Sequence, residues 1–435
     1  MNKRILKLAI PNIIANITVP LLGMVDLAIV GRTGGEQLIG AIAISTTIFN
    51  LIYWNFGFLR MGTSGFTAQA YGANDMKESM AILTRGLVIA LSLSLLIILF
   101  QSPIAYLSEK FINTSPEIMQ SALVYFFIRI WAAPATLGLY IIKGWFIGMQ
   151  NSHIPMIVSI LLNIINIFFS IFLAVYLKMG IAGVAWGTVI AQYSGLIIGI
   201  IFWFIKFSNL KVHINLKESL HWSKLKLFFK VNIDIFLRTL CLSIVFAFIP
   251  FISASLGDRI LAVNTLLMQL FTIFSYILDG FAYAGEALTG RYIGAKDSKL
   301  LKLSTKYLLI YGFILTFVFT IAYLFWGKNI LFLFTKDIEI IKSSEDFLKW
   351  IVLVPICGMA AFIFDGIYIG AIASKTMRNV MFVATASFFI SYYSLINFLG
   401  NDAIWIAFLI FLAFRGGLMW IMYPKKILVE STEIN

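Results

Sequence analysis

The stretch AIPNIIANITVPLLGMVDLAIVG, residues 9–31, is apolar and long enough to cross a bilayer, which takes about 20 helical residues. It nevertheless contains Asp26, two prolines, Pro11 and Pro20, and Asn16. At about 100° per residue, Asn16, Pro20 and Asp26 share roughly a third of the helix circumference. A carboxylate inside a spanning helix costs on the order of 2.5–3.5 kcal/mol and usually marks a transport path. We therefore interpret the remainder of the chain as a frame for this polar face.

The composition predicts a membrane protein. Of the 435 residues, 60% are hydrophobic and only 12% are charged, and the mean hydropathy is +0.94. A soluble fold cannot bury that much apolar surface, and apolar runs of about 20 residues recur along the whole chain. The fold class that we predict is an all-α polytopic membrane protein, with the lipid bilayer as a partner.

Twelve spans follow from the apolar runs and the residues that break them. We expect them at 8–31, 38–60, 84–107, 120–146, 154–177, 181–205, 231–256, 261–288, 303–326, 348–371, 378–399 and 402–423. Basic residues number twenty in the segments that we place on the N-terminal side of the membrane and eight in the other loops. This bias predicts that both termini are cytoplasmic. It also accounts for the net charge of +13 without a nucleic-acid partner.

The two halves of the chain repeat at an offset of 222 positions, which lays residues 35–75 over 257–297 without a gap. The same offset superposes the Gly-xxx-Gly motif at Gly144 on the one at Gly366. Six spans return each half to the same side, so the repeats are parallel, an arrangement that in transporters places a substrate site between or within the halves. We predict a six-helix N-terminal lobe with the substrate and proton pocket, a cytoplasmic linker, and a six-helix C-terminal lobe with a short cytoplasmic tail, at 1–205, 206–230 and 231–435.

The linker at 206–230 is basic, with six lysines and with leucines and Trp222 interleaved. One interpretation is a binding site for a partner or a regulator. The pattern is also typical of an amphipathic segment that lies at anionic headgroups, and we favour this second interpretation.

Hydrogen-bonding side chains in the fifth and sixth spans lie at helical spacing, so within each span they share a face. We expect these side chains, Asn163, Asn166, Ser170, Thr188 and Gln192, to form the substrate-binding pocket around Asp26 with Pro11, Asn16 and Pro20. Asp26 belongs to the first half only, because the repeat places Phe248 at its equivalent position. The alternative is that such polar residues only join helices by hydrogen bonds.

The second half contains its own ionisable residues within the spans: Asp234, Arg238, Asp279, Glu286 and Asp365. Asp234 and Arg238 are spaced for an intrahelical ion pair. Two hypotheses stay open: the acids neutralise nearby arginines in a buried network, or they form a cation site or a second proton site. We expect Arg415 to lie near a helix end, with its charge at the interface.

The sequence gives no support for bond-breaking chemistry. The glycines in GRTGGEQLIG, residues 31–40, do not match the phosphate-binding GxxxxGK[ST] motif, and the three histidines form no metal-ligand motif. We therefore predict no catalytic residues, no cofactor and no bound metal. A lipid transferase would need an interfacial His/Asp motif and large loops, and the sequence has neither. A channel or a scaffold is a further alternative, but the duplicated halves joined by one cytoplasmic linker favour alternating access.

Four motifs show a family resemblance. They are P-x8-P-x5-D-x4-GR from Pro11 to Arg32, the paired G-A-x-D loops at Gly72 and Gly294, DIFLRTL at 234–240, and LDGFAYAGEALTGR at 278–291. With them, the chain resembles the multidrug and toxic compound extrusion (MATE) family of antiporters over nearly its whole length, and its DinF-like branch in particular.

The resemblance implies two bundles that alternate between inward-open and outward-open forms, in a monomer of the bacterial inner membrane. It implies export of amphipathic, often cationic compounds in exchange for H⁺, with Na⁺ as the alternative ion. A related two-lobe exporter that flips a lipid-linked or polar metabolite is a further alternative, which would require a strongly cationic cavity.

The resemblance also implies residue roles. In this branch the carboxylate that matches Asp26 is the expected protonation site, and Pro11, Asn166 and Thr188 match positions expected to line the same pocket. Many relatives have Asp where this chain has Ser170, so Asp26 is expected to act without a second carboxylate.

Overall fold

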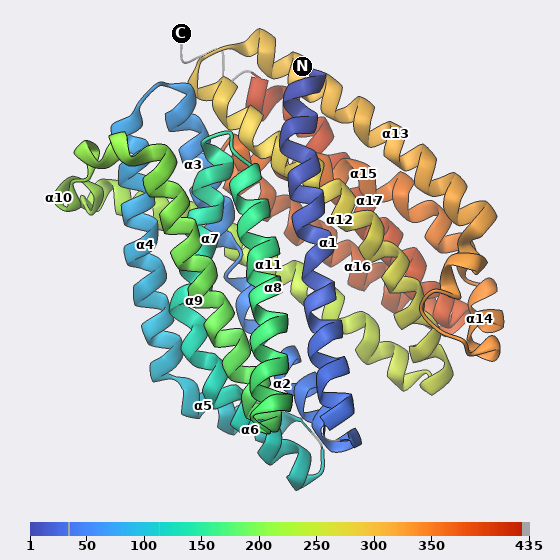
Figure 1. The fold of residues 1–435 in the computed structure, drawn as a ribbon. Helices are drawn as coiled ribbons and strands as arrows, with labels where there is room; N and C mark the ends of the chain where they lie inside the picture. The colour runs from blue at the N-terminus through green and yellow to red at the C-terminus, as the bar shows by residue number, and fades with distance from the viewer. Residues whose placement is uncertain (34, 113, 429–435) are drawn as a thin grey trace. The chain divides into compact units, whose positions relative to one another are not determined.

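The computed structural model describes residues 1–33, 35–112 and 114–428, and it leaves out the side chains of residues 19–22, 24–28, 30–33 and 36. The described part of the chain is helical (Figure 1). The helices are α1 (Asn2–Thr33), α2 (Gly35–Asn55), α3 (Phe58–Gly72), α4 (Met76–Leu99), α5 (Gln101–Phe111), α6 (Pro116–Arg129), η1 (Ile130–Ala132), α7 (Ala133–Gly148), α8 (His153–Ile171), η2 (Phe172–Tyr176), α9 (Gly180–Phe207), η3 (Ser208–His213), α10 (Leu216–Ser219), α11 (Trp222–Ser255), α12 (Asp258–Gly294), α13 (Ser298–Leu331), α14 (Ile338–Glu345), α15 (Leu348–Gly370), α16 (Ser374–Leu399), α17 (Asn401–Tyr423) and η4 (Pro424–Leu428).

Eleven helical segments within the described residues are long and apolar enough to cross a membrane. Each overlaps one of the predicted spans from the second to the twelfth, so the predicted all-α polytopic class is confirmed. The first predicted span falls on α1, which is continuous through Pro11 and Pro20. The third predicted span, 84–107, is displaced: α4 begins at Met76 and ends at Leu99, and α5 follows as a separate helix.

The residue contacts divide the chain into two compact units. The first unit is Ile14–Phe228, and the second unit combines Met1–Ile13 with the chain from Phe229 onward. The first turns of α1 therefore belong to the second unit, where Gly280 of α12 makes room for Ala9 and Ile13. Arg4 in the same segment donates from Nη1 to the Tyr292 hydroxyl at 3.2 Å.

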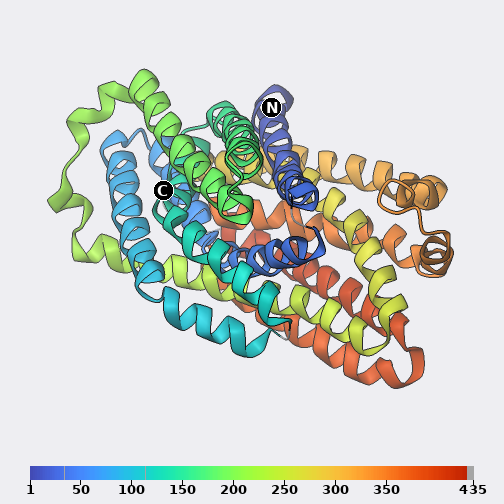
Figure 2. The same cartoon turned by 60° about the horizontal axis from the view of Figure 1, so that its bottom comes forward.

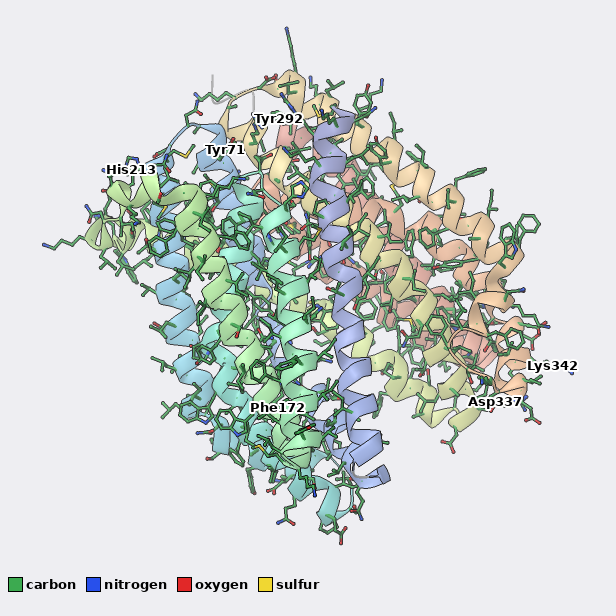
Figure 3. The ribbon with its side chains drawn as sticks, viewed as in Figure 1. Tyr71, Phe172, His213, Tyr292, Asp337 and Lys342 are labelled. Carbon is green, nitrogen blue, oxygen red and sulfur yellow. The ribbon has the colours of Figure 1, made fainter. Side chains whose placement is uncertain are left out.

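Within the first unit, the helices run from one end to the other, as spanning helices must. Figure 3 places Tyr71, near the end of α3, and His213, just after α9, at one end of this unit. Phe172, at the end of α8, lies at the opposite end. In the second unit, Tyr292 near the end of α12 and Asp337 before α14 are likewise at opposite ends.

The internal repeat extends to the backbone of the G-A-x-D loops. Asn74 and Lys296, which are 222 positions apart, both adopt the left-handed conformation, with φ of 57° and 54°. The next residue of each loop caps the following helix: the Asp75 carboxylate accepts from the amide of Glu78 and the Asp297 carboxylate from that of Leu300, both at 2.8 Å. These loops therefore stop one helix and start the next in both halves.

The helix packing repeats at the same offset. Contacts of α7 with α3, α4 and α9 have counterparts in contacts of α15 with α12, α13 and α17. A Cβ at Gly144 would overlap the carbonyl oxygen of Arg60, and a Cβ at Gly366 would overlap that of Ala282, its equivalent. The Gly-xxx-Gly motifs therefore allow two backbones to approach closely, as small residues do in membrane helix packing.

The segment between the halves is partly helical and lies against α4 (Figures 1 and 2). Buried Arg85 of α4 donates from Nε to the carbonyl oxygen of Ser219 in α10 at 2.8 Å. Around it, Lys77 pairs with Glu218 at 2.9 Å and Lys224 with Glu78 at 2.5 Å. The segment is therefore fixed to α4 by one buried hydrogen bond and two ion pairs nearer the surface.

Candidate functional site

Of the site residues predicted on α1, the structure describes Pro11 and Asn16, and the two belong to different units. Pro11 is buried in the second unit, and Asn16 is half-buried in the first. The side chains of Pro20 and Asp26 lie outside the described residues. Their backbone belongs to the continuous helix α1.

The predicted polar faces of α8 and α9 meet at Asn166 and Thr188. The Asn166 amide donates from Nδ2 to the Thr188 hydroxyl at 3.0 Å, and Thr188 in turn donates to the Val184 carbonyl oxygen at 3.2 Å. Both side chains are buried. The carbonyl half of the Asn166 amide, Oδ1, has no hydrogen-bond partner among the described residues. A buried acceptor without a hydrogen bond destabilises the fold by about 1–3 kcal/mol. A ligand or a water molecule that donates to Oδ1 would remove this cost.

Ser170 lies one helical turn beyond Asn166 and is also fully buried. It packs against Gly187 of α9, where an added Cβ would lie 2.6 Å from its hydroxyl oxygen. Its hydroxyl has no hydrogen-bond partner within the described part of the chain. Gln192, one turn beyond Thr188 on α9, is half-buried. Asn166, Ser170 and Thr188 thus form one buried polar patch between α8 and α9.

Asn163 connects this patch to α1 within the first unit. Its amide donates from Nδ2 to the carbonyl oxygen of Thr18 at 3.0 Å. The two helices run in the same direction side by side (Figures 1 and 3). Asp26 follows Thr18 by eight residues, about 12 Å along a helix, and Ser170 follows Asn163 by seven residues. The backbone of Asp26 is therefore expected at the depth of Ser170.

The second unit holds a different kind of polar cluster, centred on Asp365 of α15. Arg238 of α11 and Arg415 of α17 both donate from Nη2 to the Asp365 Oδ2 atom. All three residues are buried, with exposed fractions of 4%, 3% and 7% for Arg238, Arg415 and Asp365. One buried carboxylate thus accepts from two guanidinium groups on two other helices.

Asp234 has its own partners on another helix. Its carboxylate accepts from Arg378 Nη1 at 2.6 Å and from the Ser374 hydroxyl at 2.9 Å, both on α16. The predicted intrahelical pair between Asp234 and Arg238 is therefore wrong, because each residue has a partner on a different helix. The prediction that Arg415 lies near a helix end with its charge at the interface is also wrong, because Arg415 lies two turns inside α17 and is buried against Asp365.

Glu286 is fully buried, on the stretch of α12 that packs against Gly370 of α15.

At the repeat position of Asp365, the first unit has Lys143, whose Nζ atom donates to the Ser159 hydroxyl at 2.8 Å. Equivalent positions in the two halves therefore carry opposite charges.

Comparisons with known proteins identify the family. The MatE family model matches residues 11–172 and 235–393, well over half of the chain. DNA damage-inducible protein F of Escherichia coli (strain K12) is 36% identical over 416 residues, which cover 95% of this chain and 90% of that protein.

This chain belongs to the MatE family.

More distant relatives and solved structures agree with this assignment. The chloroplastic Protein DETOXIFICATION 45 of Arabidopsis thaliana is 24% identical over 395 residues, 85% of this chain and 69% of that protein. The crystal structure of MATE in the bent conformation matches with a TM-score of 0.87 at 20% identity, covering 100% of this chain and 96% of the other. An outward-facing multidrug resistance MATE family transporter of the MOP superfamily matches at 0.84 and 19% identity over 99% of this chain and 96% of the other. These structures show the fold.

As a MATE transporter, the protein is a multi-pass membrane protein that couples efflux to a cation and is not an enzyme. The structure brings Asn163, Asn166, Ser170 and Thr188 of this transporter into one patch. The sequence analysis allowed for a buried network of acids and arginines in the second unit, but it did not identify Arg415 and Arg378 as partners. It also missed Gly187, although the spacing of Gly183 and Gly187 in α9 is a small-residue pattern that predicts close helix packing.

Proposed function

We propose that this MATE-family protein is a proton-coupled antiporter that exports amphipathic, often cationic compounds by alternating access. Asp26 is the proton acceptor in this proposal, and it shares a pocket in the first unit with the polar patch of α8 and α9. Protonation removes a charge from a low-dielectric site, so proton and cationic substrate compete for the same carboxylate. Exchange follows from this competition.

The observation that carries the proposal is the open acceptor at Asn166. This amide is held by Thr188, yet its Oδ1 atom is buried with no described partner. Hydrogen bonds to a substrate or to a protonated carboxyl group would satisfy it. Asn163 fixes α1 beside this acceptor at Thr18, so Asp26 is expected at a suitable depth.

The second unit supports H⁺ rather than Na⁺ as the coupling ion. Asp365 and Asp234 already accept hydrogen bonds from arginines. A Na⁺ ion at Asp365 would have to displace two buried guanidinium groups, which would leave charges unpaired at a cost of several kcal/mol. We therefore propose that these acids form a structural network, and that Asp26 carries the coupling alone.

The remaining features of the proposal concern the protein in its membrane. We propose a monomer in a bacterial inner membrane with both termini in the cytoplasm, and lobes at 1–205 and 231–435 joined by the linker at 206–230. The basic residues at one end of the first unit, which include Lys77 and Lys224, support this orientation.

A gradient experiment tests the coupling ion. The full chain is reconstituted in liposomes, and uptake of a fluorescent amphipathic cation is driven either by a pH gradient or by a Na⁺ gradient at equal pH on both sides. We expect uptake with the pH gradient alone. Uptake that follows the Na⁺ gradient and ignores the pH gradient would overturn the choice of ion, and a failure of both gradients would overturn the antiport proposal.

A further inference from the structure

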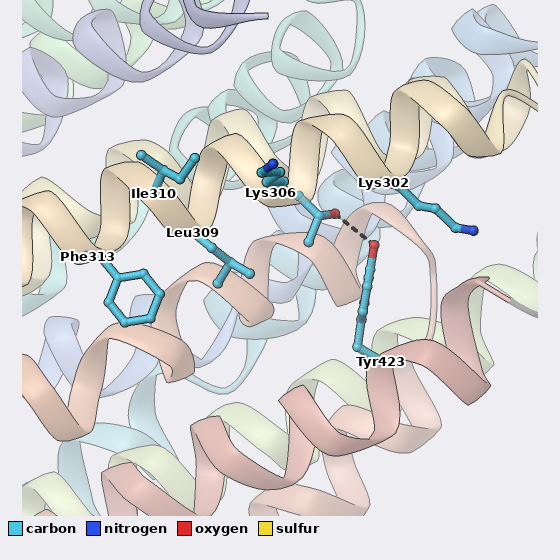
Figure 4. Close-up of a pocket in the computed structure, with 7 residues that line it drawn as sticks. Lys302, Lys306, Leu309, Ile310, Phe313 and Tyr423 are labelled. Carbon is cyan, nitrogen blue, oxygen red and sulfur yellow. Dashed lines mark hydrogen bonds between the residues drawn. The ribbon is translucent and has the colours of Figure 1, made fainter.

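A groove opens on the surface of the second unit between α13 and α17 (Figure 4). Both helices pack on α15, and the space between them measures about 350 Å³. Its lining consists of Lys302, Thr305, Lys306, Leu309, Ile310, Phe313 and Tyr423. The Tyr423 hydroxyl donates to the Thr305 hydroxyl at 2.9 Å and closes the floor between the helices.

The groove is polar at one end and apolar along its length. Lys302 and Lys306 are exposed, and neither has an ion-pair partner within the described ranges. Three residues further along α13, the wall becomes apolar with Leu309, Ile310 and Phe313. From Lys302 to Phe313 the helix rises by about 16 Å, about half of the 30 Å hydrocarbon thickness. This dimension fits the headgroup and the upper acyl chain of a phospholipid.

The charge at the basic end is of one sign. The lining contains no acidic residue, and Lys425 and Lys426 in η4 are also exposed directly after Tyr423. Basic pockets between membrane helices bind anionic lipid headgroups, with about 1 kcal/mol for each Lys or Arg near the surface. The surface is therefore complementary to a phosphate group.

The equivalent surface of the first unit is closed. The offset of 222 places Met80 and Thr84 where the second unit has Lys302 and Lys306. Met80 is buried, and α4 is covered by η3 and α10, which follow α9 in the chain. The first unit thus covers this surface with its own backbone, while the second unit presents two lysines there.

We propose that the α13–α17 groove binds an anionic phospholipid. Lys302 and Lys306 contact the phosphate, and an acyl chain lies along Leu309, Ile310 and Phe313. The other candidate occupant is the C-terminal segment 429–435, which contains two glutamates. Its two glutamates match the lysines, but it has only Val429 and Ile434 for the apolar wall, so the chemistry favours the lipid.

Native mass spectrometry of the full chain tests this proposal. The purified protein is titrated with phosphatidylglycerol or with phosphatidylcholine of the same acyl chains, and retained lipid is counted at rising collision energy. We expect preferential retention of phosphatidylglycerol, reduced about fivefold by each of Lys302→Gln and Lys306→Gln. The matched control is Lys299→Gln, an exposed lysine on the same helix that does not line the groove, which should change retention little.

Two further measurements distinguish an intact phospholipid from a free phosphate and from the C-terminal segment as the occupant of the groove. Inorganic phosphate and glycerol phosphate, which lack acyl chains, should not displace phosphatidylglycerol; displacement at equal concentration would show a plain anion patch and overturn the proposal. A chain that ends at residue 428 should bind as the full chain does. Binding that appears only after this truncation would show that the C-terminal segment occupies the groove. Equal retention of the two lipids by the full chain would also overturn the proposal.

Discussion

The amide of Asn166 is held by the hydroxyl of Thr188 at 3.0 Å, and its carbonyl oxygen, buried beside that contact, has no partner in the described part of the chain. One polar side chain thus stabilises the contact between α8 and α9 while it keeps an acceptor available. The same residue serves helix packing and, in our proposal, ligand binding. The two interpretations of the polar residues in these spans are therefore compatible.

The hydrogen bond between Asn166 and Thr188 predicts a measurable coupling. A double-mutant cycle of Asn166→Leu and Thr188→Val should give a coupling of about 0.6 kcal/mol, and no more than about 1.7, as for other interhelical bonds in membranes. Thermal unfolding in detergent measures it. The control cycle combines Asn166→Leu with Thr320→Val and should show no coupling. The Thr320 hydroxyl is buried with no hydrogen-bond partner in the described residues. A cycle with no coupling would contradict the observed contact.

The cluster at Asp365 predicts an asymmetric effect of charge removal. Asp365→Asn should destabilise the protein by about 3–5 kcal/mol, because it leaves two buried arginines without their carboxylate. A second substitution, Arg415→Gln, should restore part of this loss by removing one excess charge. Glu345→Gln breaks an exposed pair with Lys328 and should cost about 0–1 kcal/mol. If Asp365→Asn were as mild as this control, Asp365 would have no structural role.

The Gly-xxx-Gly motifs predict strong steric effects. Gly144→Ala and Gly366→Ala would each place a Cβ against a backbone carbonyl of the neighbouring helix, and overpacking typically costs about 1–3 kcal/mol. Gly417→Ala on α17 meets no atom within 4 Å and should be neutral or slightly stabilising. Fluorescence-detected size exclusion after heating ranks the three variants, and equal behaviour would refute the close approach.

The contact between Arg85 and Ser219 predicts how the linker is held. Arg85→Gln should loosen α10 and the segment around it, because the buried guanidinium group joins α10 to α4. Limited trypsin digestion should then cleave faster after Lys211 or Lys217, both exposed. Lys77→Gln removes only the exposed pair with Glu218 and should change the cleavage rate little. Similar rates in both variants would show that Arg85 does not anchor the segment.

Hydropathy and the repeat predicted most of the fold. Apolar runs gave the spans because a membrane helix must bury its backbone polar groups internally. They did not predict the break between Leu99 and Gln101, because the apolar run of α4 continues past the end of that helix. They also did not show that the first turns of α1 belong with the second unit, since this depends on packing against Gly280.

The site was predictable in part. Helical spacing placed Asn163, Asn166 and Ser170 on one face, and the structure confirms that α8 meets α9 and α1 through this face. Partners of charged residues were not predictable in this way. Asp365 and Arg415 are 50 positions apart, and spacing rules describe contacts within one helix, not contacts between helices.

The central claim is that Asp26 exchanges a proton for substrate. The direct measurement compares the full chain with Asp26→Asn in liposomes, recording uptake of a fluorescent amphipathic cation under a pH gradient and, separately, substrate counterflow without a gradient. We predict that Asp26→Asn loses the uptake driven by the pH gradient, while any counterflow that remains no longer depends on pH. Uptake by Asp26→Asn at the rate of the unsubstituted protein under the same gradient would contradict the account.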